Sequence, residues 1–275
     1  MKVPRDSNRR PPDSSLMTRR GWMVRMAAGV SVAAALAWPE VSLAAKAKPK
    51  KTDKSRPSPQ PAQLPTLAVL YFDTHTPPEH ELYVLRKGLA QMLISDLGVL
   101  EGVTIVERDR LEALIVEQKL QHSAAFDAST AVRVGKLLGA RFLVLGSVLK
   151  LGAAIRIDAR VVEVETGSIV FAAGVSGKGD DFFGLEGQLA DRLRTELIAR
   201  RPALAVPPAT ATQRPKKRIL RRPKALSIET AGRYAKALDA KDRGDKAGAQ
   251  TGLAAVVREA PDFELAYIDL QSMTN

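Results

Sequence analysis

Apolar residues between Leu64 and Arg200 follow short runs and helical spacing in turn, which predicts strands and helices along this part of the chain. The run Leu67–Phe72 is typical of a short buried strand, and Val103–Val106 of a second one. Between them, a stripe at helical spacing predicts a helix with one buried face: Leu82, Leu85, Leu89, Met92 and Leu93. Thr76-Pro77-Pro78-Glu79 has the form of a capping box with proline at the first helical position, so we expect the helix to start there.

Two more helices are expected between residues 107 and 140. Asp109, followed three residues later by an acid, predicts a capped start for the first, whose buried face holds Leu111, Leu114 and Ile115. Ser129 predicts a cap for the second, and Gly139 is its expected stop. We interpret Gln121–Asp127 as a polar loop with His122 exposed, and Glu107-Arg108-Asp109 as a helix cap beside charge pairs at the edge of a strand.

Three long strands follow with little between them. Phe142–Val148 is apolar, residues 155–164 alternate with period 2, and Ile169–Val175 pairs back across a turn at Glu165-Thr166-Gly167-Ser168, which predicts an antiparallel meander. A last helix is expected from Asp180 to Ile198. Residues 64–200 therefore predict an α/β (α+β) domain, a three-layer sandwich whose mixed sheet has about five strands.

Residues 225–275 predict a small helical module. One helix is expected over Thr230–Arg243 and a second over Ala247–Ala260, with Gly244 in the turn, Ala249 packed between them and Pro261 ending the second. This spacing resembles a tetratricopeptide repeat, with the usual first-helix aromatic displaced to Tyr234. The alternative is a plain helical hairpin that docks on the first domain.

The net charge of +12 comes from segments outside the two predicted folded parts. The Pro-rich linkers 45–63 and 201–224 carry +5 and +8, whereas residues 64–200 carry −3 and residues 225–275 carry −2. A basic face on a folded domain is the usual footprint of specific nucleic-acid binding, so we expect none here. The basic linkers are suited to contact with anionic envelope polymers.

Residues 1–44 have the form of an export signal. Arg19 and Arg20 form a twin-arginine-like pattern before an Ala-rich apolar run, and small residues before Ala44 predict cleavage after it. A weaker second cut follows Ala47, and an uncleaved N-terminal anchor is the alternative. The chain has no cysteine, so disulfides, thiolate metal sites and a lipid-anchored N-terminal cysteine are excluded.

Residues 64–200 resemble the periplasmic α/β domain of the CsgG-like family of curli secretion and the related TolB N-terminal-like domains. The resemblance rests on four stretches in order: Leu67–Phe72, Val106–Leu111 leading into a helix, Gly135–Ala140 before Val144–Val148, and Ala159–Gly167. The family's channel-forming member is a lipoprotein with two inserted membrane hairpins. Here Gly152 joins two strands with almost no insertion, and Ser176–Asp181 leaves no room for the second hairpin, so a self-formed pore is not expected.

No catalytic, cofactor or metal site is predicted. Ser147 lies outside a Gly-x-Ser-x-Gly elbow, no phosphate-binding glycine loop is present, and the acidic groups near Asp158 and Asp180 fit a solvated strand face and a turn. The sequence predicts a non-enzymatic cell-envelope protein in the periplasm or on the periplasmic face of the outer membrane. It would act as a scaffold or accessory factor in assembly or secretion, through envelope proteins or its own copies. The alternatives are a domain that senses a small molecule or glycan and, third, a secretion-channel subunit.

Overall fold

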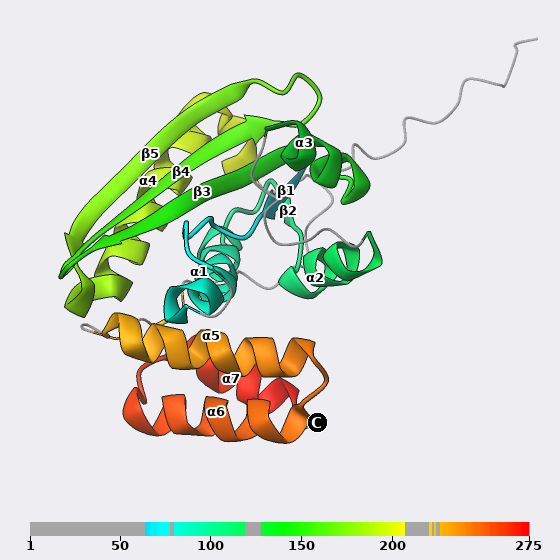
Figure 1. The fold of residues 1–275 in the computed structure, drawn as a ribbon. Helices are drawn as coiled ribbons and strands as arrows, with labels where there is room; N and C mark the ends of the chain where they lie inside the picture. Colours follow the sequence, from blue (N-terminus) through cyan, green and yellow to red (C-terminus); the bar gives the residue numbers. More distant parts are fainter. Residues whose placement is uncertain are drawn as a thin grey trace, which may run out of the picture. The chain divides into compact units, whose positions relative to one another are not determined.

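The computed structural model describes residues 64–77, 80–118, 128–206, 220–221, 223 and 226–274. The described residues form five strands and seven α-helices (Figure 1). The strands are β1 (Thr66–Val69), β2 (Thr104–Ile105), β3 (Phe142–Leu151), β4 (Ala154–Glu163) and β5 (Ile169–Lys178). The helices are α1 (Glu81–Leu97), α2 (Arg108–Glu117), α3 (Ala128–Leu137), α4 (Phe182–Arg200), α5 (Ile228–Asp242), α6 (Lys246–Glu259) and α7 (Glu264–Ser272).

The five strands make one mixed sheet in the order β2-β1-β3-β4-β5. β1 runs parallel to β2 and β3, while β3, β4 and β5 form the expected antiparallel meander. β3 and β4 are joined through the two residues Gly152 and Ala153, which hold the full ten-residue register from Leu151↔Ala154 to Phe142↔Glu163. The predicted α/β fold with a mixed five-stranded sheet is confirmed.

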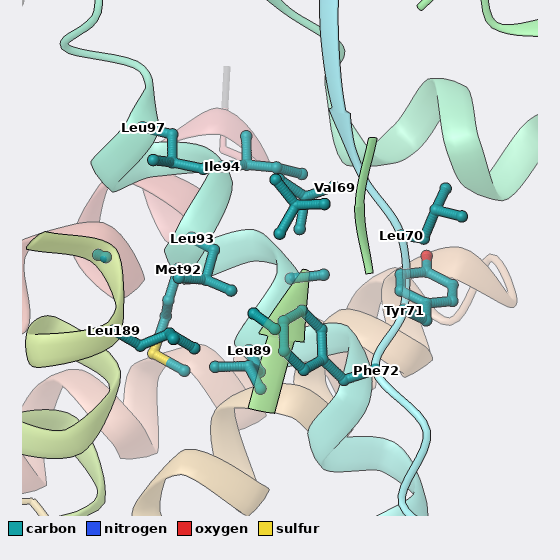
Figure 2. Close-up of a cluster of buried hydrophobic side chains, with 14 of the residues drawn as sticks. Val69, Leu70, Tyr71, Phe72, Leu89, Met92, Leu93, Ile94, Leu97 and Leu189 are labelled. Atoms are coloured by element: carbon teal, nitrogen blue, oxygen red, sulfur yellow. The ribbon is translucent and has the colours of Figure 1, made fainter. Parts of the chain in front are cut away.

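One face of the sheet carries the main core. Ile155, Ile157 and Val161 point to this face of β4 and are buried. α1 and α4 pack there, and the aliphatic residues of α1 meet β1 and Leu189 of α4 (Figure 2). The helical stripe read from the sequence is the buried face of α1, because residues at i, i+3 and i+4 share one side of a helix.

The opposite face is covered only in part. α3 covers the start of β3, where a side chain at Gly135 would lie 2.8 Å from Leu143 and Val164. Further along, every second residue of β4 and β5 faces outward without a helix above it, and Arg156, Ala172 and Ser176 are exposed. One face of the sheet is therefore covered by helices, and the other face is open over β4 and β5.

The helical module packs closely on the α/β domain. A side chain added at Gly88 of α1 would meet the Cβ of Ala235 on α5 at 3.0 Å. Phe263, at the start of α7, stacks edge-on against Phe183 of α4 at 4.8 Å and against Tyr234 of α5 at 4.9 Å. One continuous hydrophobic core thus runs through both parts. The helical module is thus docked on the first domain, and α7 follows α5 and α6 as its third helix.

Three predicted helix starts are wrong, those at Thr76, Asp109 and Ser129. Ser129 lies inside α3, which already includes Ala128. α1 begins at Glu81, with the imidazole Nδ1 of His80 accepting from the amide of Leu82, while Thr76 bonds the hydroxyl of Thr74. The residue before a proline is disfavoured in helical geometry. Because Pro77 precedes Pro78, the start of α1 moves downstream. α2 begins at Arg108 after Glu107, and Asp109 lies in its first turn. Asp109 accepts from Arg108 instead of capping, because a buried guanidinium competes for its carboxylate.

Two glycines lie where the sequence placed them, one at the end of a helix and one in a turn. Gly139 ends α3 in the left-handed region at φ 66°, and Gly244 has φ 83° between α5 and α6, conformations that glycine adopts without steric cost. The Gln121–Asp127 loop and His122 lie outside the described residues. Among the helices that the structure describes, none combines the length and the apolarity required to cross a bilayer.

Candidate protein-interaction surface

A cluster of charged side chains joins α1, α2 and α5, and we call it the junction cluster: Tyr71, Lys87, Arg108, Glu112, Asp239 and Asp242. The Nζ of Lys87 lies 2.8 Å from Asp242, 2.9 Å from Asp239 and 3.0 Å from Glu112. Arg108 donates to both carboxylate oxygens of Asp242, at 2.7 and 2.9 Å. Such a bidentate geometry is the strongest form of a charge-assisted hydrogen bond.

Burial and pairing set the charge states in the junction cluster. Burial opposes the charged form of Asp242, but the hydrogen bonds from Arg108 and Lys87 outweigh it and hold the pKa of Asp242 below its usual value. Burial likewise acts against the Lys87 ammonium, and its bonds to Asp242 and Asp239 outweigh that effect and raise the Lys87 pKa. Burial raises the pKa of the Tyr71 hydroxyl, which stays protonated and donates to Glu112 at 2.5 Å.

The junction cluster is closed to ligands. The side chains of Arg108, Asp242 and Lys87 are 1, 6 and 7% exposed, and each charge already faces an opposite charge. Shifted pKa values mark active sites, but structural ion-pair networks produce them as well. We therefore assign the cluster to domain docking. The sequence interpretation of Arg108 as a surface pair at a strand edge is wrong, because its partner Asp242 comes from a helix far away in the sequence.

The three residues predicted to serve helical-repeat packing differ in burial. Gly244 is in the turn, Ala249 is buried in α6, and Pro261 is exposed just after that helix. α5 and α6 also approach each other closely at Gly252, where an added side chain would meet the Cβ of Ala237 at 2.9 Å. This pair is not among the positions predicted from the sequence, although small residues on facing helices are the signal for such a contact. Arg19, Arg20 and Ala44 lie outside the described residues.

β5 forms an open edge of the sheet. It pairs with β4 on one side, and no strand that the structure describes pairs with its other side. Alternate residues of an antiparallel edge strand turn their N–H and C=O groups away from the sheet. The two-residue turn at Gly152 and Ala153 and the β4–β5 register place Ala172, Gly174 and Ser176 in this outward set. The guanidinium of Arg192 donates to the carbonyl of Gly174 at 2.5 Å and covers one of these groups.

A groove of about 520 Å³ runs beside this edge, between β5 and α4. We call it the β5 groove: Ala172, Ala173, Gly174, Asp191, Arg192, Thr195 and Glu196. Its strand wall consists of very small residues, so an approaching backbone meets little steric hindrance. Its helix wall has both signs of charge. The arrangement suits an added extended segment, whose main chain bonds the edge while alternate side chains enter the groove.

The α/β domain, which contains the open edge of β5, is in part similar to a known protein family. Residues 50–156 match the family model of the curli production assembly/transport component CsgG, and the match runs through β1, α1, β2, α2, α3, β3 and the start of β4. The α/β domain up to the start of β4 is therefore similar in sequence to CsgG. This likeness fits an accessory role associated with the cell envelope.

Solved structures similar to the chain include the LpoB C-terminal domain from Escherichia coli, at 16% identity over 42% of this chain and 83% of that one, with a TM-score of 0.31. The lipoprotein GNA1162 from Neisseria meningitidis is 14% identical over 48% of this chain and 95% of that one, with a TM-score of 0.36. A curated relative, the putative adenylate cyclase 3 of Rhizobium meliloti (strain 1021), is 26% identical over 151 residues. That match covers 53% of this chain and about a quarter (24%) of the relative's length.

Proposed function

We propose that this protein is a non-enzymatic accessory factor of the cell envelope, whose CsgG-like domain binds an extended segment of a partner protein at the edge of β5. The observation that carries the proposal is the open edge of a ten-residue strand beside the β5 groove. Main-chain hydrogen bonds to an edge give affinity, and side-chain pockets beside it give specificity. The CsgG match, to an assembly and transport component by its name, supports a role in envelope assembly or secretion.

Arg192 gives this edge a defined resting state. Exposed edges promote aggregation, and charged side chains placed along them are a common protection. Arg192 is exposed and donates to the outward carbonyl of Gly174. A backbone amide of an incoming strand would replace the guanidinium as the donor to this carbonyl. A partner that carries a carboxylate at the matching position would re-pair the displaced guanidinium.

The test is site-specific photo-crosslinking in cells from Thr195, which is exposed on the helix wall of the groove. A partner added to β5 gives one discrete adduct that Ser176→Pro abolishes. The Ser176 amide points outward, so proline there removes an edge donor and leaves the β4–β5 ladder intact. Ala247→Pro is the matched control, since it puts proline into the exposed first turn of α6, where it is tolerated.

The outcomes separate the kinds of occupant. An adduct with the mass of two copies of this chain identifies a second copy at the edge, in place of a different partner. An adduct that persists unchanged in Ser176→Pro contradicts strand addition. Both variants should unfold at the same midpoint temperature as the wild-type protein, which checks that neither has lost its fold.

We also propose export through the N-terminal segment, with Arg19 and Arg20 recognised by the transport machinery and cleavage after Ala44. The mature protein would then lie in the periplasm or on the periplasmic face of the outer membrane. Paired Arg19→Lys and Arg20→Lys substitutions are expected to retain the full-length chain in the cytoplasm. N-terminal sequencing of the exported form is expected to begin at Ala45, and a mature form that still begins at Met1 would contradict the cleavage.

The non-enzymatic proposal is supported by the closed state of the junction cluster, whose shifted pKa values come from ion pairs between buried side chains. The name of the curated relative describes a protein of which about a quarter is matched (24%), so we do not extend its activity to this chain. We further propose that the helical module packs in the manner of a tetratricopeptide repeat, with Gly244, Ala249 and Pro261 in their repeat positions. The basic linkers would add contacts to anionic envelope polymers.

A further inference from the structure

A second hollow, of about 310 Å³, lies on the open face of the sheet just beyond the end of β1. We call it the β1 hollow. Its polar walls come from Ser147 on β3, Asp158 and Arg160 on β4, and Asp73 and His75 in the segment after β1. The segment after β1 stays paired to β3 as far as the bridge between Asp73 and Ser147, so the hollow lies at the carboxyl end of β1. Ligands in open α/β sheets bind at the carboxyl ends of strands.

The segment after β1 is fixed on β3 in an unusual conformation. The Asp73 amide donates to the carbonyl of Gly146 at 2.9 Å, and the Asp73 carbonyl accepts from Val148 at 2.7 Å. His75 has φ 50°, the left-handed region that residues other than glycine rarely adopt. The Asp73 carboxylate holds it there, accepting from the His75 amide at 2.8 Å and lying 3.2 Å from its Nδ1. The imidazole is therefore held at the wall of the hollow through its Nδ1 edge, and its Nε2 is left for another contact.

The two carboxylates of the hollow already have partners. Both oxygens of Asp158 face Arg156, at 2.6 and 2.8 Å. This pair lies flat across β5 because the neighbour there is Gly174, where a side chain would come within 2.5 Å of Asp158. The Asp73 carboxylate is engaged by His75.

Two hydrogen-bond donors in the walls of the hollow, on Arg160 and Ser147, have no such partner among the described residues. Arg160 forms no ion pair with any residue that the structure describes, and the Ser147 hydroxyl has no hydrogen bond within the same part of the chain. The two guanidinium groups, Arg156 and Arg160, cancel the charges of Asp73 and Asp158, so an incoming negative charge meets no net repulsion. Arg160 and Ser147 therefore remain available to an acceptor from outside, and a planar or tetrahedral oxyanion matches a guanidinium.

We propose that the β1 hollow binds a small molecule through an oxyanion, a carboxylate or phosphate group, held by the Arg160 guanidinium and the Ser147 hydroxyl. The volume is at the lower end of the range for small-ligand sites, which suits a compact metabolite-sized ligand. This site is separate from strand addition at β5 and does not depend on it. It gives the envelope factor a means of responding to a small anion.

The test is a titration of the isotope-labelled mature chain with inorganic phosphate, and separately with acetate, at fixed ionic strength, followed by backbone amide shifts. The expected result is saturable shifts at Ser147, Arg160 and their strand neighbours with one or both anions. Arg160→Gln is expected to weaken that binding at least about tenfold, the loss of one charge-assisted bidentate pair. Ser147→Ala is expected to weaken it about threefold, the loss of one neutral hydrogen bond.

Arg258→Gln, an exposed arginine on α6, is the matched control and should leave the affinity unchanged. Saturation by phosphate alone assigns a phosphate group, and saturation by acetate alone assigns a carboxylate. Shifts that do not saturate, or that are equal in Arg160→Gln and wild type, overturn the proposal. Since none of these variants alters the outward groups of β5, the crosslink from Thr195 is expected to persist in them, which keeps failure of the two proposals distinguishable.

Discussion

At the residue scale, Arg108 links the two parts of the protein. Its side chain is 1% exposed, and it reaches Asp242 at the end of α5, Asp109 beside it and the hydroxyl of Tyr71. A buried charge is tolerated when it is fully paired, and removal of one partner leaves an uncompensated charge. The docking of the helical module therefore depends on a few specific atoms as well as on apolar area.

We predict that Asp242→Asn lowers the free energy of unfolding by about 3 kcal/mol, because Arg108 and Lys87 both lose a buried counter-charge. Chemical denaturation of the mature chain measures it. Asp262→Asn, an exposed aspartate before α7, is the matched control and should change stability by no more than about 0.5 kcal/mol. Equal effects of the two substitutions would contradict a special role for the junction cluster.

The same cluster predicts a pH dependence. Since the pKa of Asp242 is lower in the folded state, its contribution is present above the unfolded value of about 4 and is lost as pH falls below it. The Lys87 pKa is raised, so its contribution is present below about 10.4 and is lost as pH rises through its higher folded value. Burial raises the pKa of Asp269. Its contribution to the free energy of unfolding therefore changes with pH in the direction opposite to that of Asp242 on the acid side. The difference in unfolding free energy between wild type and Asp242→Asn should therefore shrink on the acid limb.

At the element scale, the contact of α1 with α5 depends on small residues. Gly88 faces Ala235 at a distance that leaves no room for a larger side chain. Close approach of two helices brings their backbones near each other and lets the junction cluster form beside the contact. The same device recurs between α5 and α6, where Gly252 faces Ala237.

We predict that Gly88→Leu separates α1 from α5 and destabilises the protein by about 2 kcal/mol, the cost typical of overpacking. Gly232→Leu is the matched control, since nothing lies within 4 Å of the position where its side chain would begin. Within a helix, replacing glycine adds helix propensity, so the control should be neutral or slightly stabilising. Thermal unfolding of the two variants decides it, and a control that is destabilised as much as Gly88→Leu would refute the packing account.

At the scale of the whole molecule, the described domain and helical module share one core, and neither closes its surface alone. Separation would expose the Gly88 face of α1 and leave Lys87 and Arg108 without Asp242. A helical hairpin with one more helix buries too little apolar surface to be stable by itself.

We therefore predict that residues 225–275 expressed alone are largely unfolded by circular dichroism, and that residues 64–206 alone aggregate. A protease site placed within residues 207–219 of the full chain provides the control, because the cut halves should stay associated on gel filtration. A cut chain that dissociates into two folded parts would show that the module is independent.

The sequence by itself determined the order of the elements and the class of the fold. Periods of 2 and 3.6, with glycines at turns, are local properties, so the meander, Gly139 and the helices of the C-terminal module follow from them. Cap sites at Thr76 and Asp109 did not, because a cap is decided by competing partners: Pro78 displaces one start and buried Arg108 takes the carboxylate of the other. Only the tertiary structure decided the role of Arg108, the open edge of β5 and the meeting of Asp73, Ser147 and Arg160. Each joins residues that are distant in sequence, and their pairing depends on burial and register, which no local pattern contains.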